Sequence, residues 1–423
     1  MRAMAEPPRI HIVGAGLAGL SAAVVLADRG LRVVLSEAAK QAGGRCRSYH
    51  DSVLDTVIDN GNHLVLSGNV AVTRYLRAIG AADRLTGPDH PIFPFFDLGT
   101  GRRWVLRPND GPIPWWILDS HRRVPGTNPL EYLAFATLMR RHPGRRIDEV
   151  LSCRGPLWDM FLKQLLVSAL NTDPKEGSAD LAGAVVRETL ARGGHATRPL
   201  VATPSLAAAF VDPALMHLGR QGAEIRFGRP LRAITLAEDR VAALHFDDGE
   251  QQVDAAEQVI LAVPPWTAQS LLPDVKTPSA FNAIVNGHFR IAPPPRAASL
   301  TGLVGGTAEW VFAFHDRLSV TVSAADRLLD MDTDRLASLL WADVAAVHDL
   351  QGPVPPTRIV KEKRATFAAT PAQEARRPAA ATRWHNLFLA GDWTATGLPA
   401  TIEGALRSGE VAASLATGSG TTR

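Results

Sequence analysis

Residues 10–37, IHIVGAGLAGLSAAVVLADRGLRVVLSE, decide the fold of this chain. The pattern predicts a buried strand at Ile10–Val13, a helix at Leu17–Asp28 that stops at Gly30, and a second strand at Arg32–Ser36. In the G-x-G-x-x-G turn, the first glycine allows a tight turn, the second lets the backbone approach a pyrophosphate, and the third lets helix and strand pack closely. We therefore expect this turn to bind a dinucleotide through Gly14, Ala15, Gly16, Leu17, Ala18 and Gly19.

An acidic residue completes the fingerprint. Glu37 lies 18 residues after Gly19, at the end of the second strand, where a carboxylate can accept hydrogen bonds from both ribose hydroxyls. The N-terminus of the helix offers free N–H groups and a positive dipole end to the phosphates. Because strand, turn, helix, strand and acid occur in register, the sequence predicts a dinucleotide-binding domain rather than an isolated tight turn.

The same apolar run, from Ile10 to Ala27, is long enough to suggest a signal peptide or a membrane span. Its three patterned glycines and the strand that follows argue against both, and no other window of the sequence is apolar for long enough to span a bilayer. We therefore expect a cytoplasmic protein that at most lies against the cytoplasmic face of the membrane.

The composition fits a folded protein of two interleaved domains. Of the 423 residues, 46% are apolar and 21% are charged, which excludes a disordered chain. The formal charge of +3 is small and spread along the chain, so nucleic acid is not an expected partner. Cys46 and Cys153 are too few for a disulfide framework or a zinc site, so we expect a reducing compartment and no metal.

Later segments return to the pattern of a nucleotide-binding domain. Helices are predicted at Ser205–Gln221 and Thr401–Ala416, and strands at Glu224–Phe227, Arg232–Leu236, Val241–Phe246, Val259–Val263 and Asn386–Ala390. The chain is thus expected to visit this domain three times, at residues 1–66, 203–272 and 385–423. Residues 67–202 and 273–384 would form the second domain, in which helical periodicity occurs at Pro129–Arg141 and Pro156–Leu170.

Two further motifs distinguish FAD from NAD. Gly43, Gly44 and Arg45 follow Glu37 closely, and near the other end a strand stops at Gly391-Asp392. Together these resemble the glutathione-reductase-type FAD fold, in its amine oxidase and carotenoid desaturase branch. The resemblance implies an α/β protein with a Rossmann-like FAD domain and an interleaved α+β substrate domain. It also implies Arg45 near the pyrophosphate, Asp392 near the ribityl chain or a phosphate, and a helix dipole aimed at the flavin from Thr401, Ile402 and Ala405.

Four short motifs narrow this resemblance: Asp59–His63 (DNGNH), Leu170–Thr172 (LNT), Arg364–Phe367 (RATF) and Gly391–Thr401 (GDWTATGLPAT). They are similar to those of the hydroxysqualene dehydroxylases, the squalene-associated FAD-dependent enzymes of hopanoid synthesis, over nearly the whole chain. The resemblance implies that reduced flavin converts hydroxysqualene to squalene with release of water, and that upstream isoprenoid synthases are partners. Because no cysteine lies near the C-terminal flavin segment, we expect FAD to be bound non-covalently.

The implied reaction needs a proton donor. Loss of the hydroxyl from an allylic alcohol leaves a resonance-stabilised cation that a hydride from flavin N5 can quench, but the hydroxyl must be protonated to leave. His63 and Asp59 are the candidate acids, because the resemblance places their segment beside the flavin, and Asn171 is a candidate hydrogen-bond partner of the hydroxyl. Alternatively, Asn60-Gly61 forms a hairpin turn that Asp59 and Asn62 only brace.

Three other functions stay open at this point. A carotenoid-type desaturase would run related chemistry on a polyene, and a non-catalytic FAD-bound protein would hand isoprenoid between enzymes. A flavin amine oxidase is disfavoured, because enzymes of that class place tyrosines and a lysine beside the flavin. Here Tyr49, Tyr75 and Tyr132 all lie in the first third of the chain, and Lys276 comes too early to match that lysine.

An oily substrate suggests a surface that meets the membrane. Trp115, Trp116, Ile117 and Leu118 precede Arg122-Arg123, and aromatic residues beside basic ones suit a membrane interface. A second basic cluster at residues 140–146 could meet anionic lipid or simply form a solvated helix end.

Overall fold

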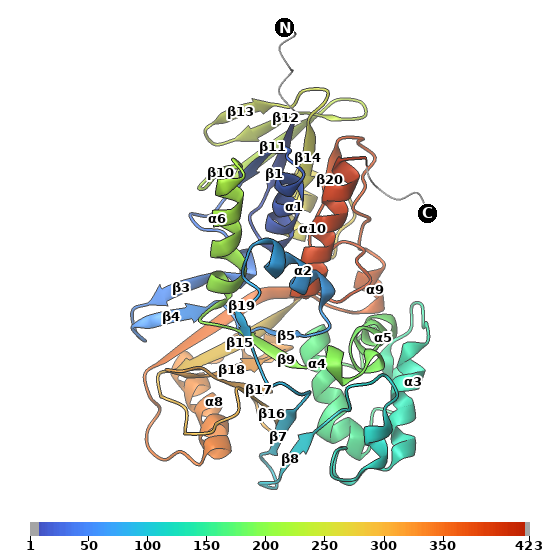
Figure 1. Ribbon diagram of the computed structural model, residues 1–423, viewed down its shortest axis with the longest axis vertical. Helices are drawn as coiled ribbons and strands as arrows, with labels where there is room; N and C mark the ends of the chain where they lie inside the picture. The colour runs from blue at the N-terminus through green and yellow to red at the C-terminus, as the bar shows by residue number, and fades with distance from the viewer. Residues whose placement is uncertain (1–7, 419–423) are drawn as a thin grey trace.

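A five-stranded parallel sheet forms the framework of the upper unit in Figure 1. The computed structural model describes residues 8–418 of the chain. The strands lie in the order β10 (Glu224–Arg226), β2 (Arg32–Ser36), β1 (Arg9–Val13), β14 (Gln258–Leu261) and β20 (Leu387–Leu389). They come from the beginning, the middle and the end of the chain, as the fingerprint and the later strand patterns predicted.

Helices cover this sheet, and one of them is buried on nearly every side. The helix α1 (Leu17–Asp28) is apolar all round and packs along α10 (Ile402–Ala416), where a Cβ on Gly409 would lie 2.2 Å from the Ala18 carbonyl oxygen. Two further helices, α6 (Asp212–Arg220) and α2 (Val70–Ala78), contribute to the same core. The helix α2 therefore packs on the nucleotide-type unit, although the expected boundary at residue 66 assigned it to the second domain.

The lower unit contains a seven-stranded, mainly antiparallel sheet. Its order is β19 (Thr357–Phe367), β15 (Phe281–Phe289), β18 (Leu318–Val322), β17 (Trp310–Ala313), β16 (Leu300–Val304), β7 (Phe93–Asp97) and β8 (Arg103–Leu106). One face is apolar and packs under α8 (Thr333–His348), as the alternation along β15 and β18 requires. The other face is unusually polar and carries the buried side chains of Asn286, His288, Ser319 and Thr321.

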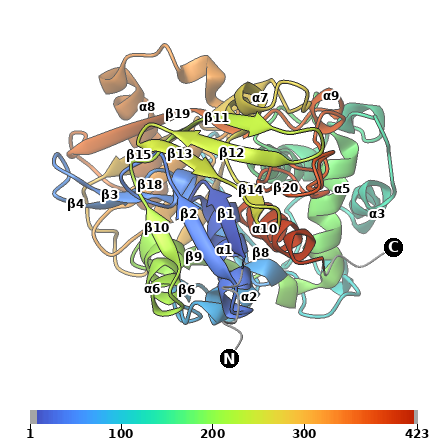
Figure 2. The same cartoon turned by 90° about the horizontal axis from the view of Figure 1, so that it is seen from above.

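Smaller elements join and flank these two sheets. A three-stranded antiparallel sheet of β11 (Leu231–Leu236), β12 (Val241–Phe246) and β13 (Gly249–Gln252) lies at the top of the molecule in Figure 1 and faces the viewer in Figure 2. The remaining strands are β3 (Ser48–Asp51), β4 (Thr56–Asp59), β5 (Leu64–Leu66), β6 (Leu85–Thr86) and β9 (Pro199–Ala202). The remaining helices are α3 (Leu133–Met139), α4 (Lys163–Leu170), α5 (Ala179–Glu188), α7 (Pro265–Leu271) and α9 (Pro371–Glu374).

The structure corrects the sequence predictions at several element ends. The helix expected at Pro129–Arg141 begins as a 3-10 turn and ends at Met139, and a π-helical turn at Trp158–Leu162 interrupts the helix expected at Pro156–Leu170. The Asn60-Gly61 hairpin is wrong, because β4 pairs with β3 whereas β5 pairs with β9. The outermost residues of the expected FAD-domain ranges, 1–7 and 419–423, lie outside the described residues.

Candidate functional site

The three glycines of the first turn have three different surroundings. Gly14 has a φ of +107°, and a Cβ there would lie 2.4 Å from the Ala262 carbonyl oxygen. A Cβ on Gly19 would lie 1.9 Å from the Gly14 carbonyl oxygen. At Gly16, in contrast, a Cβ would meet no protein atom within 4 Å. Packing therefore explains the outer two glycines, whereas the middle one faces open space.

That open space lies at the N-terminus of α1. Among the described residues, no side chain caps the first N–H groups of this helix, whose N-cap residue is Gly16. N–H groups without a side-chain cap, together with a positive dipole end, fit a pyrophosphate. The other predicted residues of the turn, Ala15, Leu17 and Ala18, are buried and hold the turn against the sheet.

Glu37 ends β2 opposite this turn. Its Oε2 accepts a hydrogen bond from the Ala15 N–H at 2.7 Å, and its Oε1 accepts one from the Ala39 N–H at 2.8 Å. Each carboxylate oxygen can accept a second hydrogen bond, so both remain able to bind hydroxyl groups. The half-buried carboxylate thus braces the turn and still presents acceptors where the ribose is expected.

The structure joins two motifs that lie far apart in the sequence. Arg45 donates from Nη2 to Asp392 Oδ2 at 2.6 Å and from Nη1 to the Ala365 carbonyl oxygen at 2.6 Å. The Arg45 side chain is nevertheless 42% exposed, so its other N–H groups remain free to meet a ligand. Gly43, at a φ of +106°, donates its N–H to the Ala15 carbonyl oxygen, and the exposed Gly44 follows it. The predicted cofactor residues of both motifs therefore meet beside the first turn.

Arg377 organises this region, although none of the motifs in the sequence includes it. The buried Arg377 donates from Nη2 to the Asp392 carbonyl oxygen at 3.0 Å and to Thr396 Oγ1 at 2.6 Å, and from Nε to the Thr394 carbonyl oxygen at 2.9 Å. It thereby fixes the backbone of the segment between β20 and α10. Its Nη1 also donates to Glu374 Oε2 at 2.7 Å, and this pair, three residues apart, is a local signal that the sequence offers for Arg377.

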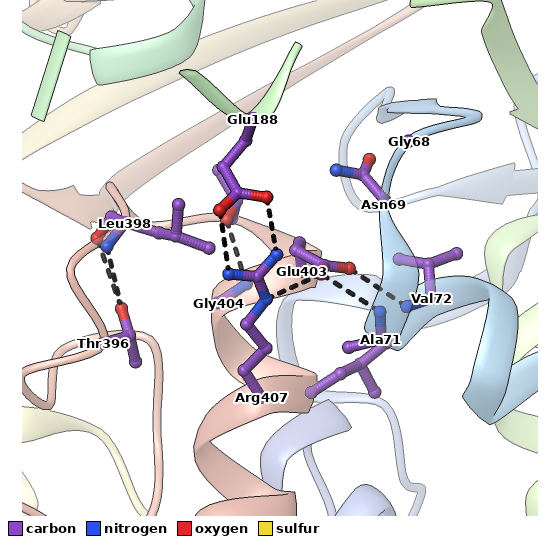
Figure 3. Close-up of polar contacts among 12 residues, drawn as sticks. Gly68, Asn69, Ala71, Val72, Glu188, Thr396, Leu398, Glu403, Gly404 and Arg407 are labelled. Atoms are coloured by element: carbon purple, nitrogen blue, oxygen red, sulfur yellow. Dashed lines mark hydrogen bonds and ion pairs between the residues drawn. The ribbon is translucent and has the colours of Figure 1, made fainter. Parts of the chain in front are cut away.

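The start of α10 is held by a second network, drawn in Figure 3. Thr401 caps the helix by accepting from the Gly404 N–H, and the side chains of Ile402 and Ala405 follow in its first turn. The buried Glu403 accepts from the Ala71 and Val72 N–H groups, at 3.0 Å each, so it caps α2. Arg407 donates to Glu403 at 2.7 Å and to Glu188 of α5 at 2.9 Å. This ion-pair network fixes the direction of the α10 dipole.

The predicted acids, His63 and Asp59, lie in different surroundings. His63 is half-buried near the Arg45–Asp392 pair, and burial together with the Arg45 guanidinium lowers its pKa to about 4. The imidazole is therefore neutral at pH 7, and the role of His63 as an acid stays a prediction. Burial raises the pKa of Asp59, whose Oδ1 accepts from Ser48 Oγ at 2.5 Å and from the Leu206 N–H at 2.9 Å. Asp59 thus braces the entry to the helical segment at residues 206–220.

Asn171 has its polar atoms engaged within the protein. It ends α4 in the left-handed region at a φ of +47°, donates from Nδ2 to Thr366 Oγ1 at 2.9 Å, and accepts at Oδ1 from the Ala324 N–H at 2.7 Å. Nδ2 also donates to the Asn282 carbonyl oxygen at 3.2 Å. Asn171 therefore ties α4 to the polar face of the seven-stranded sheet, and its contact with a substrate hydroxyl stays a prediction.

Known proteins resemble this chain over nearly its whole length. A family model described as flavin containing amine oxidoreductase matches residues 17–416. Hydroxysqualene dehydroxylases of Rhodopseudomonas palustris and Sinorhizobium fredii are 51% and 50% identical, over 97% of this chain and 99% and 98% of theirs. A crystal structure of wild-type putrescine oxidase bound to putrescine aligns with a TM-score of 0.67 at 15% identity, over 96% of this chain and 98% of that one. This last likeness concerns the fold alone.

Proposed function

We propose that this chain, which belongs to the hydroxysqualene dehydroxylases within the flavin-containing amine oxidoreductases, reduces hydroxysqualene to squalene. The chain is an FAD-dependent oxidoreductase. Sequence identities of 51% and 50% to two hydroxysqualene dehydroxylases, over nearly the full length of both chains, support hydroxysqualene as the substrate. The geometry supports the choice of cofactor, because the uncapped start of α1, Gly16, Glu37 and the Arg45–Asp392 pair converge on one region.

Each group of residues has a proposed task in this reaction. FAD, when reduced, supplies the hydride that replaces the hydroxyl. The N-terminus of α1 and Arg45 would hold the pyrophosphate, and Glu37 the ribose. The Thr401-capped start of α10 would present its positive dipole end to the flavin. His63, which is neutral at pH 7, would contact the substrate hydroxyl by a hydrogen bond.

The decisive experiment is an anaerobic incubation of reduced holoprotein with hydroxysqualene, read by mass spectrometry. Squalene is the expected product, with one molecule formed per reduced flavin. Oxidised holoprotein is the control and should leave the substrate unchanged. A desaturated product would instead support the carotenoid-type reaction, and binding without turnover would support an isoprenoid-handling protein.

We also propose that the substrate is collected from the surface of an anionic bilayer. No helix within residues 8–418 is long and apolar enough to cross a membrane. Exposed apolar side chains gather on one segment of the lower unit: Ile113 76%, Trp115 50%, Leu118 70%, Leu130 76% and Leu133 61%. The Arg122 guanidinium lies over the Trp115 ring, and the exposed Arg140 and Arg141 follow α3, so apolar and basic groups share this region.

This apolar segment differs from the predicted one. Trp116 is 4% exposed and packs edge-on against Tyr132, so it belongs to the core, and Ile117 is half-buried. Arg145 and Arg146 are ion-paired with Glu149 and Asp148, which leaves them less available to lipid. Replacing Trp115 and Leu118 by Ser should reduce sedimentation with anionic vesicles and leave FAD content normal. Met216→Ser, at an exposed apolar residue of α6, is the matched control and should bind as the wild type does.

A further inference from the structure

The polar face of the seven-stranded sheet carries a buried amide that lacks one partner. Asn286 of β15 is 1% exposed, and its Oδ1 accepts from Thr321 Oγ1 at 2.9 Å and from the Asn62 N–H at 3.3 Å. A backbone N–H can only donate, so the contact with Asn62 identifies the amide oxygen and fixes the direction of Nδ2. Nδ2 donates to no acceptor within residues 8–418 and retains accessible surface. A buried donor of this kind needs a partner from outside the protein.

A second polar group without a partner faces the same place. A Cβ on Gly61 would lie 3.2 Å from Asn286 Nδ2 and 3.8 Å from His63 Nε2, so both nitrogens border the side of Gly61 that has no side chain. Within residues 8–418, neither ring nitrogen of the half-buried His63 has a hydrogen-bond partner. The amide and the imidazole come from different elements, because Asn286 belongs to β15 and His63 directly precedes β5. Two unpaired polar groups therefore meet at one glycine.

Hydrogen bonds place this glycine beside the residues expected to bind FAD. The preceding residue, Asn60, donates its N–H to the Arg47 carbonyl oxygen at 3.0 Å and its Nδ2 to Glu362 Oε2 of β19 at 3.0 Å. Arg45 donates to the Ala365 carbonyl oxygen of the same strand at 2.6 Å. The segment that contains the glycine therefore lies between the Arg45 motif and β19, which is the strand that pairs with β15.

The two unpaired groups together fit a hydroxyl on an apolar molecule. A carboxamide N–H donates and a neutral imidazole nitrogen can accept, whereas a hydroxyl accepts through its oxygen and donates through its O–H. The neighbours of Asn286 on the same face are apolar, because Val360 lies opposite it on β19 and Ile284 lies two residues before it on β15. Both of these side chains are only half-buried. A water molecule would satisfy the two polar groups alone, whereas an alcohol with a hydrocarbon chain would use the apolar neighbours as well.

We infer that Asn286 and His63 receive the hydroxyl of the substrate, so this inference rests on the proposed function. Asn286 Nδ2 donates to the hydroxyl oxygen, and the hydroxyl donates to His63 Nε2. These two bonds hold the hydroxyl and its carbon in one orientation. They also distinguish the alcohol from its product, because squalene has no oxygen and leaves the buried donor unpaired. The site therefore favours entry of the substrate and release of the product.

Asn286→Leu tests this inference in oxidised holoprotein, which can bind the alcohol without reducing it. Leucine has nearly the shape of asparagine but no donor. Hydroxysqualene or squalene is supplied in uncharged phosphatidylcholine vesicles, the vesicles are sedimented, and the ligand that stays with the protein is measured by mass spectrometry. Wild-type protein should prefer the alcohol. The variant should lose about 10- to 100-fold of this preference and should bind squalene no more weakly than the wild type does.

Ser319→Ala is the matched control. Ser319 of β18 lies on the same polar face, opposite His288, and its Oγ is 2.9 Å from His288 Nδ1. The substitution removes a buried hydroxyl one register pair away from Asn286 and leaves the amide unchanged, so the preference for the alcohol should stay at the wild-type value. An equal loss in both variants would mean that the polar face acts only through the structure, and would overturn the assignment.

Two further results would overturn the inference. One is wild-type protein that binds squalene as tightly as hydroxysqualene, a comparison that needs no variant. The other is Asn286→Leu that keeps the preference for the alcohol but binds FAD more weakly, which would assign the amide to the flavin. If Asn286→Leu fails to fold, Asn286→Ala takes its place, because the smaller side chain also lacks the donor. Reduced wild-type protein that binds the alcohol but forms no squalene would instead refute the proposed function and leave the binding preference standing.

Discussion

At the residue scale, Glu37 connects the local backbone to the cofactor. Its carboxylate accepts two backbone N–H groups and keeps acceptor capacity for the ribose. Glu37→Ala should weaken FAD binding about 10- to 100-fold, since hydrogen bonds to charged groups contribute about 1.5–3 kcal/mol. Equilibrium titration of the apoprotein with FAD measures the effect. Glu238→Ala, at an exposed acid of a distant turn, should bind FAD as the wild type does.

The pKa of His63 leads to a second prediction at the scale of single residues. Its pKa is about 4 in the folded protein and near 6.5 when unfolded, so the unfolded state binds the proton more tightly. His63 therefore costs no stability above pH 6.5, and its contribution becomes progressively destabilising as pH falls from 6.5 to 4. His63→Asn should flatten this part of the curve of unfolding free energy against pH. An NMR titration in which His63 gains its proton near pH 6.5 would contradict the burial.

At the scale of elements, one short 3-10 turn buries the side chain of Trp116 in the core and exposes that of Trp115 to solvent. Trp116→Ala should lower the free energy of unfolding by about 3–5 kcal/mol, because it empties a core site beside Tyr132. Trp115→Ala should cost less than about 1 kcal/mol, the range of an exposed cation–π contact with Arg122. Chemical denaturation compares the two variants. Equal losses would mean that Trp115 is also core and would refute the membrane segment.

The contact between α10 and α2 gives a further prediction. Glu403→Ala leaves two N–H groups at the start of α2 without their acceptor and should cost about 1–3 kcal/mol. Glu410→Ala on the same helix removes only a surface ion pair with Arg74, which contributes about 0–1 kcal/mol. Thermal unfolding of the two variants separates the buried cap from the surface pair. Indistinguishable melting temperatures would contradict the role given to Glu403.

Sequence patterns predicted elements well where one local signal dominates. The bounds of α1 and β2 match the prediction residue for residue, because glycine, apolar periodicity and a helix stop coincide there. Predictions were weaker where contacts with residues far away in the sequence determine whether a side chain is buried or hydrogen-bonded. Trp116 is buried by Tyr132, and Asp59 is engaged by Ser48 and Leu206, partners that the linear sequence does not bring together. Arg377 pairs with Glu374 three residues earlier, but its contacts with the Asp392 and Thr394 carbonyl oxygens leave no pattern in the sequence.

At the scale of the whole molecule, FAD should hold the two units together. The Arg45–Asp392 pair, the first turn and the segment fixed by Arg377 form one region around the expected cofactor. Removing FAD should lower the melting temperature, because a ligand at 100 times its Kd adds about 2.7 kcal/mol. Acid precipitation should release the flavin and leave a colourless polypeptide. Fluorescence that stays with the precipitate would contradict non-covalent binding.

The order of the central sheet has a consequence for synthesis on the ribosome. The N-terminal strand β1 lies between β2 and β14, and α1 packs along α10, which ends at Ala416. The first 40 residues therefore leave the exit tunnel long before their partners have been translated. Until the last helix emerges, the face of α1 that packs on α10 stays uncovered, and nascent chains with exposed apolar surface attract chaperones and each other. Truncations that stop before Ile402 should therefore aggregate rather than yield a smaller folded protein.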